Sequence, residues 1–223
     1  MKRIIFLFFS FLLAAPYVGA QANAGIPADV FYLMPEMTQG TLLFKDRNVN
    51  GKFNICAVDQ TLRFLDEKGV ELALDNDGDL QQVNFPDVTF LHAEGAFYRL
   101  YPVSDAAYVA VKRDVTVMTD TKSSSYGMTS STTAVEEIGM VQSDGHLVSF
   151  NDARQYPYKM TETAYLYRNG YLVRWNKKNC IKCFPFRKAE IEAWFAEHKK
   201  YDETDVQMVL DLCKEWGTSS FTK

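Results

Sequence analysis

Between Gly40 and Asp114, apolar and polar residues alternate in short runs that turn residues separate. Phe53, Ile55 and Ala57, for example, alternate with the residues between them, which is the period of a half-buried strand. Turns such as Asn50-Gly51 interrupt the runs at the spacing expected of an antiparallel sandwich or barrel. The runs predict strands near residues 41–45, 53–57, 62–64, 70–74, 80–85, 88–92, 97–101 and 108–117.

Residues 119–133 are rich in Ser and Thr and contain few apolar residues. Such a stretch cannot bury a face, so it predicts a long connecting loop, with a binding loop or glycan acceptor as the alternative. Further strands are expected near 135–141, 147–150, 163–168 and 171–175. Asn169-Gly170 separates the last two and can supply the two positive φ angles of a type I′ turn, which predicts a hairpin.

After Trp175 the apolar period changes from two to about 3.6. One apolar stripe predicts a helix from about Arg187 to Lys200, and a second predicts a helix that Asp202 begins and Gly217 ends. Because the two helices are close in sequence, we expect an antiparallel pair whose stripes pack on each other and on the sheet. The stripes are Ile191, Trp194, Phe195 and His198, and then Val206, Val209, Leu210 and Cys213.

The first 20 residues have the order of a secretory signal peptide. Lys2 and Arg3 precede the apolar run 4–15, and Val18-Gly19-Ala20 supplies small residues for cleavage after Ala20. The run is shorter than the roughly 20 residues that cross a bilayer. We therefore expect an exported protein, periplasmic or extracellular, in an oxidising compartment and without a membrane span after cleavage.

Three parts follow from these patterns: a signal peptide (1–20), a β-rich body (21–176) and a helical hairpin (177–223) packed on that body. At 47% hydrophobic and 14% aromatic residues, the chain can build a core without help from disulfides. The predicted fold is mainly β, in the α+β class. It is an antiparallel β-sandwich or barrel-like meander with a C-terminal helical hairpin.

The net charge of the mature chain argues against one class of partner, nucleic acids. Cleavage after Ala20 leaves 22 basic and 28 acidic side chains, a net charge near −6. A nucleic-acid-binding surface neutralises phosphates with Lys and Arg, and no such basic excess is present in the sequence. We therefore expect no nucleic-acid partner.

Four cysteines raise the question of a redox, metal or structural role. Cys180-x-x-Cys183 could be a redox dithiol or half of a zinc site, but zinc needs four ligands and no second spaced pair follows. Cys213 lies on the apolar stripe of the second helix, so a disulfide from Cys213 to Cys180 or Cys183 is expected, with Cys56 free. A Cys180–Cys183 bridge is the competing arrangement.

The sequence contains only partial matches to catalytic and metal-binding motifs. Asp75-Asn76-Asp77-Gly78-Asp79 resembles a calcium loop only in part, since Leu80 stands where Gly is needed and Pro86 where Glu is needed. It is interpreted as a plain turn. Of the three histidines, His198 extends an apolar stripe and is expected to be packed, while His92 and His146 lie in a strand and a turn. No catalytic residue, metal or cofactor is assigned.

Tyrosines are numerous in the strands and suggest two roles. Alternating tyrosines on a sheet can stack on sugars or form a protein contact surface. Cross-strand pairing within the sheet is the favoured interpretation. The residues concerned are Tyr98, Tyr101, Tyr108, Tyr156, Tyr158, Tyr165, Tyr167 and Tyr171.

Two segments, one near each end of the mature chain, carry recognisable motifs. The first comprises Phe31-Tyr32-Leu33-Met34-Pro35-Glu36-Met37, Gly40-Thr41-Leu42-Leu43-Phe44-Lys45-Asp46, Gly51-Lys52-Phe53-Asn54 and Gln60-Thr61-Leu62-Arg63-Phe64-Leu65-Asp66. The second comprises Ile181-Lys182-Cys183-Phe184-Pro185 with Lys188, Glu190 and Ile191. Both segments resemble a family of uncharacterised exported proteins from Gram-negative bacteria. The resemblance implies a β-rich body with a C-terminal helical hairpin, and it implies no activity. The Cys180 and Cys183 pair departs from the family pattern.

These observations favour a non-enzymatic structural or binding module of the cell envelope, whose partner is an unknown envelope protein or glycan. The alternative is a secreted hydrolase with a site assembled from scattered acids. A third hypothesis is a subunit that offers an exposed strand edge to a partner.

The signal peptide leads to the first testable prediction. When the full chain is expressed in a Gram-negative host, the mature protein should begin at Gln21, because Val18 and Ala20 are the small residues that the peptidase recognises. N-terminal sequencing measures this directly. A mature protein that retained Met1 would contradict export by this segment.

Overall fold

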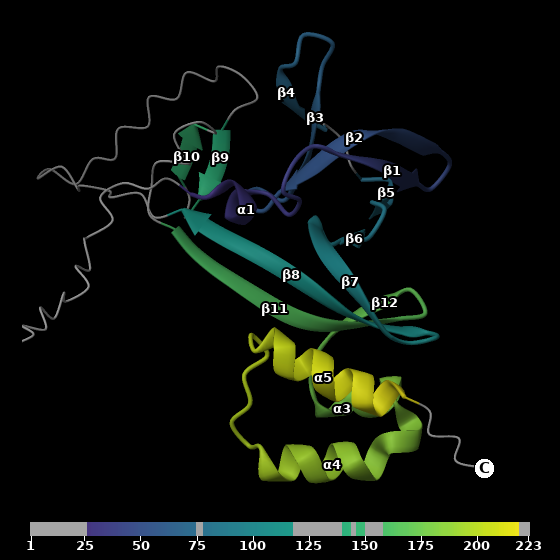
Figure 1. The fold of residues 1–223 in the computed structure, drawn as a ribbon. Coiled ribbons are helices and arrows are strands. Elements are labelled where there is room, and N and C mark those ends of the chain that lie inside the picture. The colour runs from purple at the N-terminus through teal and green to yellow at the C-terminus, as the bar shows by residue number, and fades with distance from the viewer. Residues whose placement is uncertain (1–25, 75–77, 118–139, 144–145, 150–157, 219–223) are drawn as a thin grey trace, which may run out of the picture.

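The computed structural model describes residues 26–74, 78–117, 140–143, 146–149 and 158–218. Most of this part is one antiparallel sheet of ten strands, and helices cover one side of it (Figure 1). The strands of this sheet are β1 (Thr38–Phe44), β2 (Asn48–Cys56), β3 (Thr61–Leu65), β4 (Glu71–Ala73), β5 (Leu80–Asn84), β6 (Thr89–Ala93), β7 (Ala96–Ser104), β8 (Ala107–Val117), β11 (Tyr158–Arg168) and β12 (Tyr171–Arg174). A separate pair consists of β9 (Met140–Ser143) and β10 (His146–Ser149).

Two meanders make up the large sheet. Its strand order is β12-β11-β8-β7-β6-β5-β1-β2-β3-β4, so the pairing of β1 with β5 joins the meander β1–β4 to the longer one. Every pairing is antiparallel. The predicted β-rich α+β fold is confirmed. The sheet is open, with β4 and β12 at its edges, and it curls as a barrel-like meander does (Figure 1).

Local strand signals agree with the structure where one face of a strand is buried. The predicted turn at Asn50-Gly51 is wrong, because both residues lie within β2 and pair with β1. Asn169 has φ 52° and Gly170 has φ 82°, so the hairpin between β11 and β12 has the two positive φ angles that were predicted. The end of β2 differs, because four consecutive residues, Phe53 to Cys56, are buried. One face of this segment contacts the sheet's own core, and the other lies under α1 (Ala28–Phe31).

The curl of the sheet is held by Gln60, in the turn between β2 and β3. Its side-chain amide nitrogen donates to the carbonyl oxygens of Ala57 and Arg113, each at 2.9 Å. Its side-chain oxygen accepts from the backbone N–H of Phe97 at 3.0 Å. These bonds tie the β2–β3 turn to β7 and β8, which lie several strands away in the sheet. The apolar cluster under α1 closes over the same junction, with Cys56 on one side and Val117 on the other.

At the C-terminus the structure differs from the predicted pair of helices. Three α-helices and a 3₁₀ turn are present: α3 (Lys177–Cys183), η1 (Pro185–Arg187), α4 (Lys188–Glu197) and α5 (Val206–Gly217). The segment with the cysteine pair is thus itself a helix, capped by the Asn176 side chain. The expected start of the last helix is also wrong. Asp205 is its N-cap and accepts from the Met208 N–H at 3.1 Å, whereas Asp202 accepts from the Thr204 N–H.

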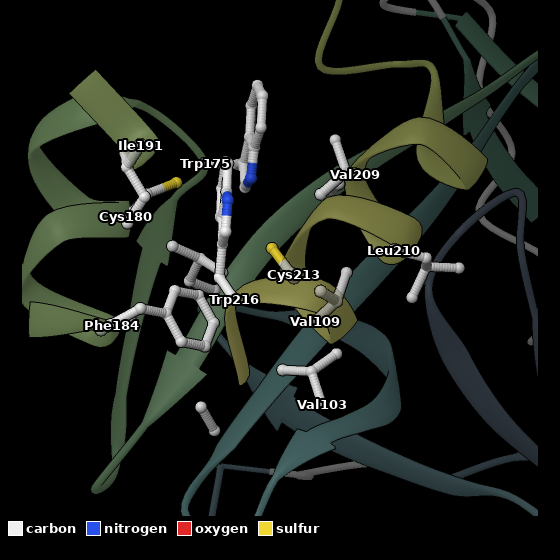
Figure 2. Packing of buried hydrophobic residues seen from close by; sticks show 14 of the residues in the cluster. Val103, Val109, Trp175, Cys180, Phe184, Ile191, Val209, Leu210, Cys213 and Trp216 are labelled. Carbon is white, nitrogen blue, oxygen red and sulfur yellow. The ribbon is translucent and has the colours of Figure 1, made fainter. Parts of the chain in front are cut away.

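The helices form a layer over β7, β8 and β11, with α5 lying nearest the strands in Figure 1. Trp175 is fully buried at the centre of this layer, and its ring lies 5.1 Å from that of Phe195 and 5.7 Å from that of Trp194. Figure 2 shows side chains from the helices and strands meeting in one cluster. The layer is therefore part of the core, because these aromatic surfaces leave water only when the helices dock.

A substitution of Leu210 tests whether α5 is docked, since this side chain is 7% exposed and packs in the core cluster. Leu210→Ala should lower the free energy of unfolding by about 2–5 kcal/mol, because the substitution removes buried methyl groups and leaves a cavity. Chemical denaturation measures the change. Glu215→Ala, on the exposed face of the same helix, is the control and should have little effect. Equal effects of the two substitutions would mean that α5 is not docked.

Candidate functional site

A groove of about 800 Å³ runs along the edge of the helical layer. One wall is the turn between β7 and β8, and the others come from η1 and the C-terminal end of α5. Its lining residues are 104–106, Arg168, 183–187 and 216–218. In volume it matches the clefts that hold ligands of moderate size.

Gly217 allows the wall formed by α5 to lie against β7. A Cβ at this position would lie 2.0 Å from the carbonyl oxygen of Val103, closer than real Cβ contacts. Only glycine permits the last turn of α5 to approach the strand so closely without a shift of backbone. The shape of the groove therefore depends on this contact.

Aromatic residues form the floor and rim of the groove. Phe184 and Trp216 are each 5% exposed, and their ring centroids lie 6.3 Å apart. A 3₁₀ turn has three residues per turn, so Phe184 and Arg187 share the side that faces the protein. Phe186 then lies on the solvent side, and its side chain is 100% exposed. No described residue covers this side chain, which lies at the rim of the groove.

Two arginines hold the groove walls together. Arg168 Nη1 donates to the carbonyl oxygens of Lys182, at 3.3 Å, and of Cys183, at the end of α3. Arg187 donates from Nη2 to the Thr218 carbonyl at 2.9 Å and from Nη1 to Glu190 at 2.8 Å. Cations at helix C-termini stabilise the negative end of the helix dipole. Both arginines therefore position the groove. Glu190 balances the charge of Arg187, so Arg168 supplies the unbalanced positive charge of the groove.

The cysteines predicted to bridge do meet in one cluster. Cys180, Cys183 and Cys213 are buried beside Trp175, and the sulfur atoms of Cys180 and Cys213 point toward each other from α3 and α5 (Figure 2). Cys56 lies far from them, under α1. All four are thiols in the structure. The disulfide of Cys213 with Cys180 or Cys183 therefore stays a prediction.

Burial governs the chemistry of these thiols. It raises the pKa of Cys213 to about 12, with the Trp175 side chain lowering it in part. Burial also raises the pKa of Cys56 to about 12 and, more strongly, the pKa of Cys180. A reactive cysteine needs a lowered pKa and access to solvent. The environment thus favours a structural role over a redox dithiol.

The histidines are dispersed. His92 Nδ1 lies 3.1 Å from the Leu80 carbonyl oxygen, and the His92 ring packs 4.7 Å from that of Phe97. His198 is exposed to solvent rather than packed in the core, although its ring stacks on Trp194 at 4.4 Å. His146 lies in β10, and its side chain is outside the described residues. Neither His92 nor His198 lines the groove.

Four of the eight tyrosines form ring contacts on the sheet. The rings of Tyr98 and Tyr165 lie 5.3 Å apart, and Tyr108 pairs in register with Tyr167 at 6.1 Å between rings. Tyr108 and Tyr167 therefore confirm the predicted cross-strand pairing, whereas Tyr98 and Tyr165 meet across β8, which lies between their strands. Tyr101, in contrast, lines a small cavity with Arg113 and Glu162. Tyr156 is outside the described residues.

The acidic turn is only partly described. Asp75, Asn76 and Asp77 lie outside the described residues, and Asp79 forms an ion pair with Lys45 at 2.7 Å. The Ser/Thr-rich stretch 119–133 also lies outside them. Within the described residues, no cluster of three or more His, Cys, Asp or Glu side chains is arranged to hold a metal ion.

Comparison with protein-family models, with curated proteins and with solved structures found no match for this chain. The family resemblance drawn from the sequence therefore stays a prediction.

The thiol cluster leads to a prediction about oxidation. Mild oxidation of the reduced protein should join Cys213 to Cys180 or Cys183, because these three share one cluster and Cys56 belongs to another. Peptide mapping without reduction, after alkylation in denaturant, identifies the bridge. Cys56 is the internal control and should be alkylated. Four alkylated cysteines, or a bridge between Cys180 and Cys183, would show the assignment to be wrong.

Proposed function

We propose that this protein is a non-enzymatic binding module of the cell envelope, and that its groove holds a polypeptide segment of a partner protein. The observation that carries the proposal is Phe186, which is 100% exposed at the rim of a groove of about 800 Å³. Exposed aromatic residues beside apolar pockets are typical of the small number of contacts that dominate protein interfaces.

Apolar contacts would supply most of the affinity. Phe184 and Trp216 offer an aromatic floor, and Pro185 and Phe186 offer an apolar rim. Burying such surface against a partner residue is favourable in proportion to the apolar area removed from water. The segment should therefore carry an apolar anchor residue.

The charge of the rim favours an acidic segment. Arg168 lines the groove without an ion pair among the described residues, and Lys182 is exposed at the end of α3 beside it, whereas Glu190 balances the charge of Arg187. Asp105 is the acidic residue among the groove-lining residues. Complementary charge speeds association and selects partners. An acidic flank next to the apolar anchor fits this rim.

The hydrolase alternative receives less support from this site. General acid–base hydrolysis needs a pair of carboxyl groups, or a histidine, close together in one cleft. Among the described residues that line the groove, Asp105 alone is acidic and none is histidine. The arrangement therefore favours holding a ligand over cleaving one.

Peptide selection on the mature protein tests the proposal. Peptides selected from a random library should carry an aromatic or aliphatic residue beside Asp or Glu. Phe186→Ala should weaken their binding about tenfold or more, because truncating a central aromatic contact costs over 1.4 kcal/mol. Isothermal titration calorimetry measures the affinities.

Leu65→Ala is the matched control, since Leu65 is also an exposed large apolar residue (47%) but lies on β3, away from the groove. It should leave the affinities unchanged. If no peptide is enriched, or if both substitutions weaken binding alike, the groove is not the binding site.

A further inference from the structure

A second site lies on the face of β7, β8 and β11 that the helices cover. One end of this face packs under α1, through Val115 and Val117. The other end packs under α5, through Val109 and Leu166. Between the two apolar clusters, the same face carries four polar residues: Arg99 and Tyr101 on β7, Arg113 on β8 and Glu162 on β11. We refer to these four residues as the seam site.

Arg113 is fixed in place on the floor of the seam site. Its Nε donates to Glu162 Oε1 at 2.8 Å, and its Nη1 donates to the Asp29 carbonyl oxygen at 2.9 Å. Its own carbonyl oxygen accepts from Gln60. The Glu162 carboxylate balances the charge of Arg113, so the pair is neutral and rigid.

Arg99 supplies the unbalanced charge. Its guanidinium carbon lies 5.0 Å from the ring centroid of Tyr101, a cation–π contact that orients it. Among the described residues, Arg99 has no ion pair or hydrogen bond, and the Tyr101 hydroxyl has no hydrogen bond. Burial raises the pKa of Tyr101, which keeps its hydroxyl protonated and able to donate. The site as a whole has one net positive charge and two groups ready to donate.

The cavity between these groups limits the ligand. Its volume is about 30 Å³, and Leu33, Phe90 and Val111 complete its walls. A cavity needs about 10–15 Å³ for each water-sized atom, so this one has room for about two. Two oxygen atoms are those of a carboxylate. A phosphate or sulfate group, with three or four oxygens, is too large to enter fully.

We propose that the seam site binds the carboxylate group of a small organic acid, with Arg99 and Tyr101 as its donors and Arg113 as a fixed positive wall. Arginine recognises carboxylates through parallel N–H donors, and such charge-assisted bonds are strong. The remainder of the acid lies in solvent beyond the exposed Arg99. This site is separate from the groove and does not depend on its proposed function.

Titration of the ¹⁵N-labelled mature protein with acetate, followed by NMR at low ionic strength, tests the proposal. Saturable shifts are expected at the Arg99 side chain and at the backbone of β7 and β8. Arg99→Gln should weaken acetate binding about tenfold, because a charge-assisted donor is lost. Tyr101→Phe should weaken it to a smaller degree, since the ring is kept and one donor is removed. Acetamide, which has the shape of acetate without its charge, should not bind.

Arg47→Gln is the matched control. Arg47 is exposed and lies 4.6 Å over the Phe44 ring, the same kind of contact in a different place. It should leave acetate binding unchanged. Three results would overturn the proposal: shifts that do not saturate, equal loss in the two arginine variants, or tighter binding of phosphate than of acetate. Thermal melting of each variant shows whether it is folded.

Discussion

The pairing of β8 with β11 is the constraint on which the rest of the structure depends. The two strands pair along their full length, from Tyr158 opposite Val117 to Arg168 opposite Ala107. Apolar residues occupy much of one face along this length, and they must be covered for the sheet to be stable. Among the described residues, separate elements cover its two ends. A short N-terminal helix covers one end, and the C-terminal helical layer covers the other.

The end of this face that α1 covers is reached only because the sheet curls. Hydrogen bonds of the Gln60 side chain stabilise this curl. A side-chain amide that is partly removed from water costs free energy unless its donor and acceptor groups are paired. Gln60 meets this requirement with three backbone groups from separate segments. Its bonds hold the end of β2 near β7 and β8, and α1 packs on the end of β2 and on β8. The half-buried Gln60 side chain thus links strands that are distant in the sheet.

Covering the second end creates both candidate sites. The helical layer stops at the turn between β7 and β8, where α5 rests on Val103 through Gly217. The groove with Phe186 is the space left at this border. On the opposite border, between the helical layer and α1, the face of the sheet is polar, and the seam site lies there. Both sites therefore lie at borders of the helical layer. Side chains at such a border are fixed by the packed residues on one side and are open to solvent on the other.

Sequence patterns identified most of the local structure because those features depend on neighbouring residues. The turn at Asn169-Gly170 follows from the φ angles that these two residues adopt readily. The helix over Ile191 and Phe195 follows from a period that only a helix satisfies. The short helix α3 was missed, because seven residues are too few to show a period. The end of β2 was misjudged, because alternation assumes one wet face and here both faces are buried.

The candidate sites could not be predicted in the same way. Phe186 lies outside every apolar stripe, so nothing in its neighbourhood marks it as a contact residue. Arg99, Arg113 and Glu162 come from three strands, and each alone is an ordinary polar residue of a strand. The sequence by itself determined which residues turn, alternate or repeat, because those properties are local. Only the tertiary structure decided what covers each face and which polar groups are left together, because that depends on contacts between segments distant in the chain.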